Sequence, residues 1–274
     1  EVRKSAEILI AGKSAIFCWA MGLTQHENAV ATIQEIVNLQ LMLGNLGKTG
    51  AGLCPVRGHS NVQGDRTMGI YEKMPESFLD RLAEEYEFEP PREDGFDTVD
   101  AIKAMHAEEG KTFIALGGNF ISATPDTNYT AKALQNCSLT VQISTKLNRS
   151  HLITGEEALV LPCLGRSEKD EPKGEAQFIT MENSMGIVHP SQGSLTPASD
   201  KLRGEPAIVA GMAQATLGKK GKVPWKKMEK EYGIIRDHIE KIIPGFENFN
   251  QRVAGGEEFY LPNNARELDF SEIA

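Results

Sequence analysis

The stretch "TFIALGGNFISATPDTNYTAKALQNCSLTVQI", Thr112–Ile143, places two short apolar runs on either side of a polar, helix-like segment. TFIAL at 112–116 and LTVQI at 139–143 have the length and β-branched content of buried strands. A third apolar run, ALVL, follows at 158–161. Strands that are apolar on both faces are typical of a parallel sheet covered by helices on both sides. We therefore expect an α/β fold with a Rossmann-like, doubly wound parallel sheet.

The segment between the first two strands carries a helix-start signal, Thr124-Pro125-Asp126. A hydroxyl side chain is a good N-cap, proline suits the first helical position, and an acid stabilises the first turn. This pattern predicts a helix capped by Thr124 and ending near Asn136.

The first 43 residues repeat the α/β pattern. Val2–Ala11 reads as a helix closed by Gly12, "SAIFCWA" at 14–20 as a strand, and Asn28–Leu43 as a helix with apolar residues at helical spacing. This order of helix, strand, glycine turn and helix is typical of half of a doubly wound α/β domain.

Gly44–Ile70 is rich in glycine and has no hydrophobic period, so we expect a long crossing without regular structure. Such loops are usually functional or disordered, although a plain surface loop has the same composition. The amides of Asn45, Asn61 and Gln63 could pair with a large polar, planar ligand. Arg57 lies between Pro55 and Gly58, which would leave its guanidinium exposed to a cleft.

Two predicted strands end in glycine, at Met21-Gly22 and at Gly117-Gly118-Asn119. Open parallel sheets bind ligands outside the carboxyl ends of their strands, and glycine lets a ligand approach the backbone there. Ordinary strand-to-helix turns have the same pattern, so this signal is weak without further motifs.

Charge and cysteine usage restrict the class of protein. The net charge of −9 over 274 residues argues against a nucleic-acid partner. The spacing of the four cysteines fits no metal site, and we expect no metal ligand in this chain. Cys18 and Cys163 adjoin apolar runs and are predicted to be core residues.

Unpaired cysteines favour a reduced compartment, which predicts a cytoplasmic location. No apolar run reaches the length of a membrane span. The chain opens at Glu1 inside what reads as a helix, so we expect it to be a piece of a longer protein.

The stretch "GNLGKTGAGLCPVRGHSNVQGDRTMG", Gly44–Gly69, resembles a segment of molybdopterin oxidoreductases of the formate dehydrogenase type. "CWAMGLTQHENAVATIQEIVNLQLM" extends the similarity upstream, and the strands from Thr112 onward extend it to Asp170. The resemblance implies domains of the formate dehydrogenase and dimethyl sulfoxide reductase type. It also implies a molybdenum or tungsten centre held by two molybdopterin guanine dinucleotides.

The resemblance further implies a division of the chain into three parts. Residues 1–59 would complete one dinucleotide-like α/β domain, and residues 60–205 would form a second dinucleotide-binding domain. Residues 206–274 would form a helical extension toward a further domain. The Gly-rich crossing would then pass beside the metal, with its bare backbone against the pterins.

Site roles follow from the same resemblance. Arg57 would orient the substrate, because a guanidinium binds carboxylate bidentately. His59 stands where formate dehydrogenases commonly have Gln, and it could take part in proton transfer. The cofactor-binding residues implied are Met21, Gly22, Gln25, Gly58, Asn61, Gln63, Gly64, Gly118, Asn119, Ser144, Thr145 and Lys169.

This sequence also departs from its relatives after the second predicted strand, and it lacks some of their parts. Ser144 and Thr145 stand near where relatives often have an Asp for the guanine. The metal-ligating residue, and a 4Fe–4S cluster where one occurs, would lie upstream of Glu1. We therefore expect the isolated chain to hold little cofactor and to be inactive.

The implied reaction is a two-electron oxidation of a small anionic substrate such as formate, with the electrons passed to a separate partner. Two alternatives remain open. The same scaffold supports oxo transfer or reduction of oxyanions and sulfoxides, and a degenerate member could serve as a non-catalytic subunit. A plain nucleotide-binding module is less favoured, because the chain has neither a GxGxxG motif after a strand nor a P-loop.

Overall fold

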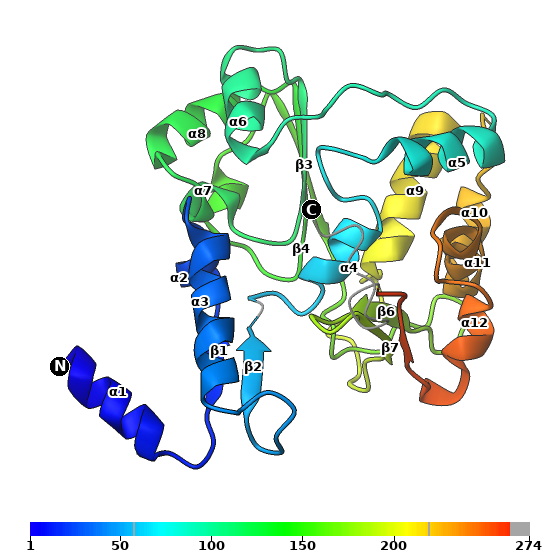
Figure 1. Cartoon of the computed structure of the whole chain (residues 1–274). Coiled ribbons are helices and arrows are strands. Elements are labelled where there is room, and N and C mark those ends of the chain that lie inside the picture. The colour runs from blue at the N-terminus through cyan, green and yellow to red at the C-terminus, as the bar shows by residue number, and fades with distance from the viewer. Residues whose placement is uncertain (57, 219, 264–274) are drawn as a thin grey trace. The chain divides into compact units, whose positions relative to one another are not determined.

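The computed structural model describes residues 1–56, 58–218 and 220–263 (Figure 1). The chain forms two compact units. The first comprises Glu1–Gly64 together with the hairpin tip Glu182–Ile187, and the second comprises Asp65–Met181 and the chain from Val188 onward. The three-part domain division expected from the sequence stays a prediction.

The second unit is built on a parallel sheet of strand order β3-β4-β5. The strands are β3 (Thr112–Leu116), β4 (Leu139–Ser144) and β5 (Glu157–Pro162). Ile114, Val141 and Leu159 are register partners across the sheet. The α/β class and the parallel arrangement expected from Thr112–Ile143 are confirmed.

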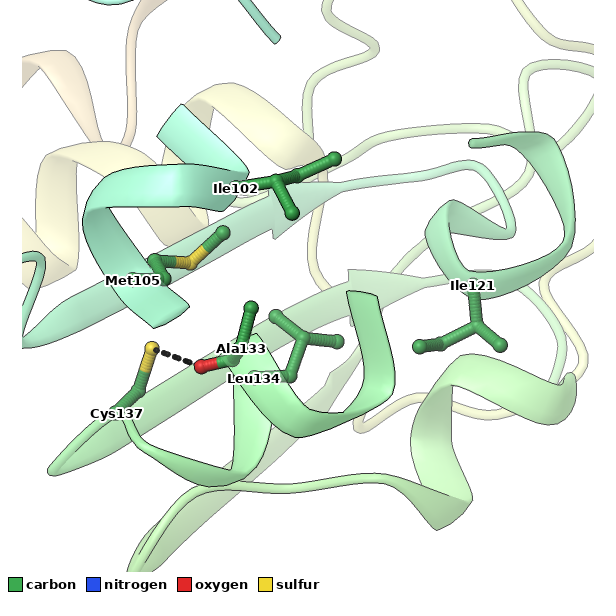
Figure 2. Close-up of a cluster of buried hydrophobic side chains, with 6 residues drawn as sticks. All are labelled: Ile102, Met105, Ile121, Ala133, Leu134 and Cys137. Carbon is green, nitrogen blue, oxygen red and sulfur yellow. Dashed lines mark hydrogen bonds between the residues drawn. The ribbon is translucent and has the colours of Figure 1, made fainter. Parts of the chain in front are cut away.

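Three helices cover one face of this sheet: α6 (Thr98–His106), α7 (Phe120–Ala123) and α8 (Thr127–Gln135). Their buried side chains form one cluster with Phe113 of β3 packed against it. Figure 2 shows this cluster, in which the Cys137 thiol also donates to the Ala133 carbonyl over 3.7 Å. Each such aliphatic side chain contributes roughly 1.5–3 kcal/mol on burial. The cluster consists of Ile102, Met105, Ile121, Ala133, Leu134 and Cys137.

The opposite face packs against α9 (Glu205–Leu217), through Ile208 and Met212. Val141 and Ile143 of the central strand are buried there. Helices therefore lie on both faces, as expected, but the predicted full coverage is wrong for the outer strands of the described chain. Ile114 is 55% exposed and Leu159 is 49% exposed, because the buried cluster with α9 centres on β4.

The start of α8 differs from the sequence prediction. Asp126, not Thr124, is the N-cap, and its carboxylate accepts from the Tyr129 N–H at 3.0 Å. The Thr124 hydroxyl instead donates to the Phe120 carbonyl at the end of α7. Since α7 ends one residue before Thr124, this hydroxyl closes one helix rather than opening the next.

The first unit contains α1 (Val2–Ala11), β1 (Ile16–Trp19), α2 (Met21–Thr24), α3 (Ala29–Met42) and β2 (Gly52–Pro55). β1 and β2 pair in parallel as a two-stranded sheet. The buried Gln40 side chain of α3 donates to the carbonyls of Ala15 and Gly52, at 3.2 and 2.9 Å. One side chain thus holds the starts of both strands together.

Two expectations about this unit are wrong. Gly44–Ile70 is not without regular structure, because it contains β2 and α4 (Val62–Thr67). β2 forms through its long-range pairing with β1, which no local pattern reveals. Cys18 is exposed rather than part of the core, because the two-stranded sheet has no described cover over that face. Cys163 is buried, as expected.

The rest of the second unit is mainly helical and has its own core. Phe246 and Phe249 pack at 4.7 Å between ring centroids and are buried with Val188 and Val253. None of the described helices is long and apolar enough to cross a bilayer. The remaining elements are α5 (Glu76–Tyr86), η1 (Arg149–Leu152), β6 (Ile179–Glu182), β7 (Ile187–Ser191), α10 (Trp225–Met228), α11 (Tyr232–Ile242), α12 (Phe249–Arg252), η2 (Ala254–Gly256) and β8 (Phe259–Tyr260).

We predict that Asp126→Ala lowers the free energy of unfolding by about 1–2 kcal/mol, because an N-cap acceptor is lost. Asp126→Asn keeps a side-chain acceptor, and asparagine tolerates the positive φ of 50° found at this position.

 The Asn variant is therefore expected to unfold at nearly the wild-type denaturant concentration. Asp94→Ala, which removes an exposed carboxylate from a loop, is the control for loss of charge. Urea unfolding followed by circular dichroism measures all three variants, and an Ala variant as stable as wild type would contradict the assignment of this cap.

A second prediction concerns His238, whose Nδ1 lies 2.8 Å from the Tyr86 hydroxyl and whose ring stacks on that of Tyr86. Burial, followed by the charge of Lys241, lowers the pKa of His238 below its ordinary value of 6.5. The unfolded chain therefore takes up this proton first as the pH falls. Stability is full above pH 6.5 and declines as the pH drops through the folded-state pKa.

We expect His238→Gln to unfold with a weaker pH dependence than wild type between about pH 7.5 and pH 5.5, a range that brackets the ordinary imidazole pKa. His26→Gln, at an exposed position, controls for the loss of one histidine. Urea unfolding at both pH values gives the comparison, and equal pH dependence in wild type and His238→Gln would refute the prediction.

Candidate functional site

The carboxyl ends of β3, β4 and β5 lie on one edge of the parallel sheet, and polar residues follow each strand there. Gly117 and Gly118 come directly after β3 with φ of 71° and 75°, a conformation that favours glycine. A Cβ atom built on either residue would meet no other atom within 4 Å. The backbone at this corner is therefore open to a close-fitting group.

Asn148, in the loop after β4, holds the glycine corner in place. Its side-chain amide donates to the Gly118 carbonyl at 2.7 Å, while its Oδ1 accepts from the Ser150 N–H at 2.9 Å. The same Oδ1 caps the short helix η1. One side chain thus fixes the loops after two neighbouring strands.

Ser150, at the centre of the same network, is buried. Its hydroxyl donates to Asn119 Oδ1 at 3.0 Å and accepts from the Ile121 N–H at 3.0 Å. Its carbonyl accepts from the Gln142 side chain of β4 at 2.8 Å. These bonds position Asn119, one of the expected cofactor-binding residues, at the edge of the sheet.

His151 completes the network and leaves one polar atom without a partner. Its Nδ1 accepts from the Asn148 N–H at 3.1 Å and also lies 3.2 Å from Asn148 Oδ1. Nε2 is buried, and among the described residues it has no hydrogen-bond partner in either tautomer. An unpaired buried polar group costs about 1–3 kcal/mol, so it marks a place where a ligand atom would be stabilising.

No local pattern in the sequence indicates this role of His151. Its ring is oriented by Asn148, three residues earlier, and that pairing exists only because both lie on the turn η1. The position just after a parallel strand is the one feature that could have indicated it.

Ser144 and Thr145 lie at the end of β4 but do not join this network through any described hydrogen bond. The Ser144 hydroxyl donates to the Lys146 carbonyl at 2.7 Å and so closes its own turn. Thr145 is exposed. Both lie at the carboxyl end of β4, and their role in binding stays a prediction.

Lys169 lines a cavity of about 360 Å³ beyond the end of β5, together with residues of the loop before α9. Glu168, next to Lys169, joins two segments that line the cavity. Its carboxylate accepts from the Gly165 and Ala198 N–H groups at 2.6 and 2.7 Å. These backbone hydrogen bonds lower the pKa of Glu168. The Tyr232 hydroxyl donates to Asp170 on another part of the wall.

Charges of both signs line this cavity. Its basic residues are Lys169, Arg203 and Lys230. Its acidic residues are Asp170, Glu171, Asp200 and Glu229. A mixed lining suits a polar group that both donates and accepts hydrogen bonds better than it suits a bare phosphate.

In the first unit, the end of β1 and the end of β2 lie side by side. The Val56 N–H donates to the Trp19 carbonyl at 2.7 Å, which extends the strand pairing. A Cβ on Gly58 would lie 3.9 Å from the Met21 side chain, so these two expected residues are neighbours. Gly22 and Gln25 lie on and just after α2, both exposed. Arg57 lies outside the described residues.

The later part of the crossing has a structural role as well. Asn61 Oδ1 accepts from the Glu182 N–H at 2.9 Å, which ties the crossing to the hairpin tip. A Cβ on Gly64 would lie only 2.1 Å from that Oδ1, so glycine is needed there. Gln63 lies in α4, and His59 is exposed.

The expected site residues thus form separate groups. Gly118 and Asn119 adjoin the network after β3 and β4, Lys169 lines the cavity beyond β5, and Met21 and Gly58 are neighbours in the first unit. Within residues 1–56, 58–218 and 220–263, no three His, Cys, Asp or Glu side chains gather as a metal site.

Known proteins match this chain over nearly its whole length. An uncharacterized oxidoreductase of Mycobacterium tuberculosis is 51% identical over 267 residues, which are 97% of this chain and 34% of that protein. Protein YdeP of Escherichia coli is 45% identical over 97% of this chain and 35% of its own length. The F420-dependent formate dehydrogenase subunit alpha of Methanocaldococcus jannaschii is 26% identical over 85% of this chain and 33% of its own length.

These comparisons agree with the parallel sheets described above. The chain spans about a third of the length of the curated relatives it matches. The sequence model for molybdopterin oxidoreductase matches residues 4–154, which include both strand-end glycine corners and the crossing between them. The chain belongs to the molybdopterin oxidoreductase family.

Proposed function

We propose that this chain is part of a molybdenum or tungsten oxidoreductase, and that its strand ends help to hold a bis-molybdopterin guanine dinucleotide cofactor. One observation carries the proposal. The buried, unpartnered Nε2 of His151 belongs to the same hydrogen-bond network as the open backbone at Gly118.

The chemistry of this edge fits such a cofactor. Guanine and pterin rings present donors and acceptors along flat edges, and the edge offers Asn119, the open Gly118 backbone and the His151 ring nitrogen. The mixed charges around Lys169 suit the same kind of group. When bound, the cofactor supplies a metal that takes two electrons from the substrate and passes them on singly.

The residues of this chain would bind and orient. Asn119 is already held by Ser150, so little conformational freedom is lost when a ligand binds. In the first unit, Met21, Gly22, Gln25 and Gly58 would contact the cofactor from the end of β1.

For the substrate, we assign Arg57 the binding of a small anion such as formate through a bidentate guanidinium contact. The similarity to a formate dehydrogenase subunit supports this assignment. His59 follows two residues later and is exposed, so we assign it proton transfer at its imidazole.

Another small oxyanion, or a sulfoxide, is the second candidate substrate. His59 stands where formate dehydrogenases commonly have Gln. A different side chain at this position favours a substrate other than formate. A panel of formate, nitrate and a sulfoxide, tested on the longer protein with an artificial electron carrier, separates the two candidates.

The cofactor proposal predicts a loss of molybdenum or tungsten in the Gly118→Ala variant of the longer protein. A methyl group at φ 75° strains the backbone and fills the open corner. Gly221→Ala is the matched control, because Gly221 also has a positive φ, 84°, and open space around it. Metal analysis and released guanine nucleotide are the measurements.

We expect metal content to fall at least several-fold in Gly118→Ala and to stay near wild type in Gly221→Ala. The 274-residue chain by itself should carry little metal. Equal metal in both variants, or a stoichiometric metal in the chain alone, would contradict these predictions.

Arg57→Lys is predicted to lower kcat/KM for the anionic substrate about 10- to 100-fold, the effect of losing one charged hydrogen bond of ~1.5–3 kcal/mol. Lysine keeps the charge but loses the planar fork. Arg66→Lys in α4 is the control, because it makes the same change at an arginine to which we assign no substrate contact. The Arg66 guanidinium carbon lies over the Tyr71 ring, 4.6 Å from the ring centroid. Steady-state kinetics decide the matter, and unchanged kinetics in Arg57→Lys would remove Arg57 from the site.

A further inference from the structure

We propose that Cys18 and Cys54 form a reversible dithiol–disulfide pair on the exposed face of the β1–β2 sheet. The two residues are register partners in these parallel strands. Neighbouring strands lie about 4.8 Å apart, and the Cα atoms of disulfides lie about 4.4–6.8 Å apart. The pair can therefore be joined with little movement of the backbone.

The register of the two strands is fixed at both ends of the pair. The Gly52 N–H donates to the Ala15 carbonyl at 3.0 Å on one side, and the Val56 N–H donates to the Trp19 carbonyl at 2.7 Å on the other. The buried Gln40 side chain adds a bond to the start of each strand. A slip of one residue would turn the cysteines to opposite faces, and these bonds oppose it.

Both thiols are on the side of the sheet that solvent reaches. Along β1, Phe17 and Trp19 are half-buried, whereas Ile16 and Cys18 are exposed. Cys54 is exposed as well. Partial desolvation, followed by a hydrogen bond with Cys54 and by its charge, raises the pKa of Cys18, which is consistent with contact between the two thiols.

The other two cysteines provide an internal contrast. Cys137 and Cys163 are 1% and 3% exposed. Burial raises the pKa of both thiols, that of Cys163 to about 11. Because the thiolate is the reacting form, these two cysteines should stay unreactive in the folded chain.

The oxidant required is a low-molecular-weight disulfide. One protein thiol loses its proton and attacks a sulfur of the small disulfide, which releases one small thiol and leaves a mixed disulfide. The second protein thiol then loses its proton and attacks the protein sulfur of that mixed disulfide, which releases the second small thiol. Two protein thiols are thereby oxidised to one disulfide, and one small disulfide is reduced to two thiols.

The cross-link would join segments that are far apart in the sequence. Cys18 lies three residues before Met21, and Cys54 lies three residues before Arg57. A two-stranded sheet is marginally stable, so a covalent link would restrict its local opening. The formation of the link does not depend on the proposed function, because neither thiol needs the cofactor.

The test treats the reduced 274-residue chain with oxidised glutathione and then blocks the remaining thiols with an alkylating reagent before trypsin digestion. We expect peptides 14–48 and 49–57 to be joined by a disulfide, and Cys137 and Cys163 to be alkylated after denaturation. Dithiothreitol should restore both thiols. Phenylarsine oxide, which binds two close thiols and releases water, should bind one equivalent per chain.

Cys18→Ser and Cys54→Ser are the matched variants. Each should lose the arsenical and form a stable glutathione adduct at its remaining exposed cysteine. Cys137→Ala should keep both the cross-link and arsenical binding. Separate glutathione adducts on Cys18 and Cys54 in wild type, a link between two chains, or no reaction in the native state would each overturn the proposal.

Discussion

Parallel pairing of β3, β4 and β5 brings the carboxyl ends of three strands to one edge of the second unit, and the candidate site depends on that arrangement. The pairing continues past the strands, because the Gly117 N–H donates to the Ile143 carbonyl at 2.8 Å. Ile143 and Val141 are buried toward α9, which anchors the central strand. The glycine corner is therefore held by the same hydrogen bonds and packing that form the sheet.

A nearly complete polar network makes this edge of the β3-β4-β5 sheet a candidate binding site. Asn148, Ser150 and Gln142 satisfy one another and the neighbouring backbone. His151 Nε2 is the member of this network that the described residues leave without a partner. Because satisfied polar networks are rigid, the unpaired nitrogen has a defined position before any ligand binds.

Sequence patterns predict the helices and strands whose formation depends on residues close together in the chain. Thr112–Leu116 forms a strand as predicted, because its short length, its β-branched and aromatic residues and the glycines after it favour a strand over a buried helix. The N-cap of α8 was misplaced, because the Thr124 hydroxyl is taken by the carbonyl of Phe120 in a preceding helix. The strand β2 and the position of His151 could not be predicted, because each depends on contacts made by the folded chain.

The turn at Leu46–Gly50 has a practical consequence. It is exposed, and Gly47 and Gly50 adopt positive φ, while buried Asn45 before it donates its N–H to the Gln40 carbonyl. Gln40 also holds Gly52 after it. Since the ends of the turn are anchored and loop-closure entropy grows slowly with length, a purification tag or fluorescent label could be inserted here without loosening the strands on either side.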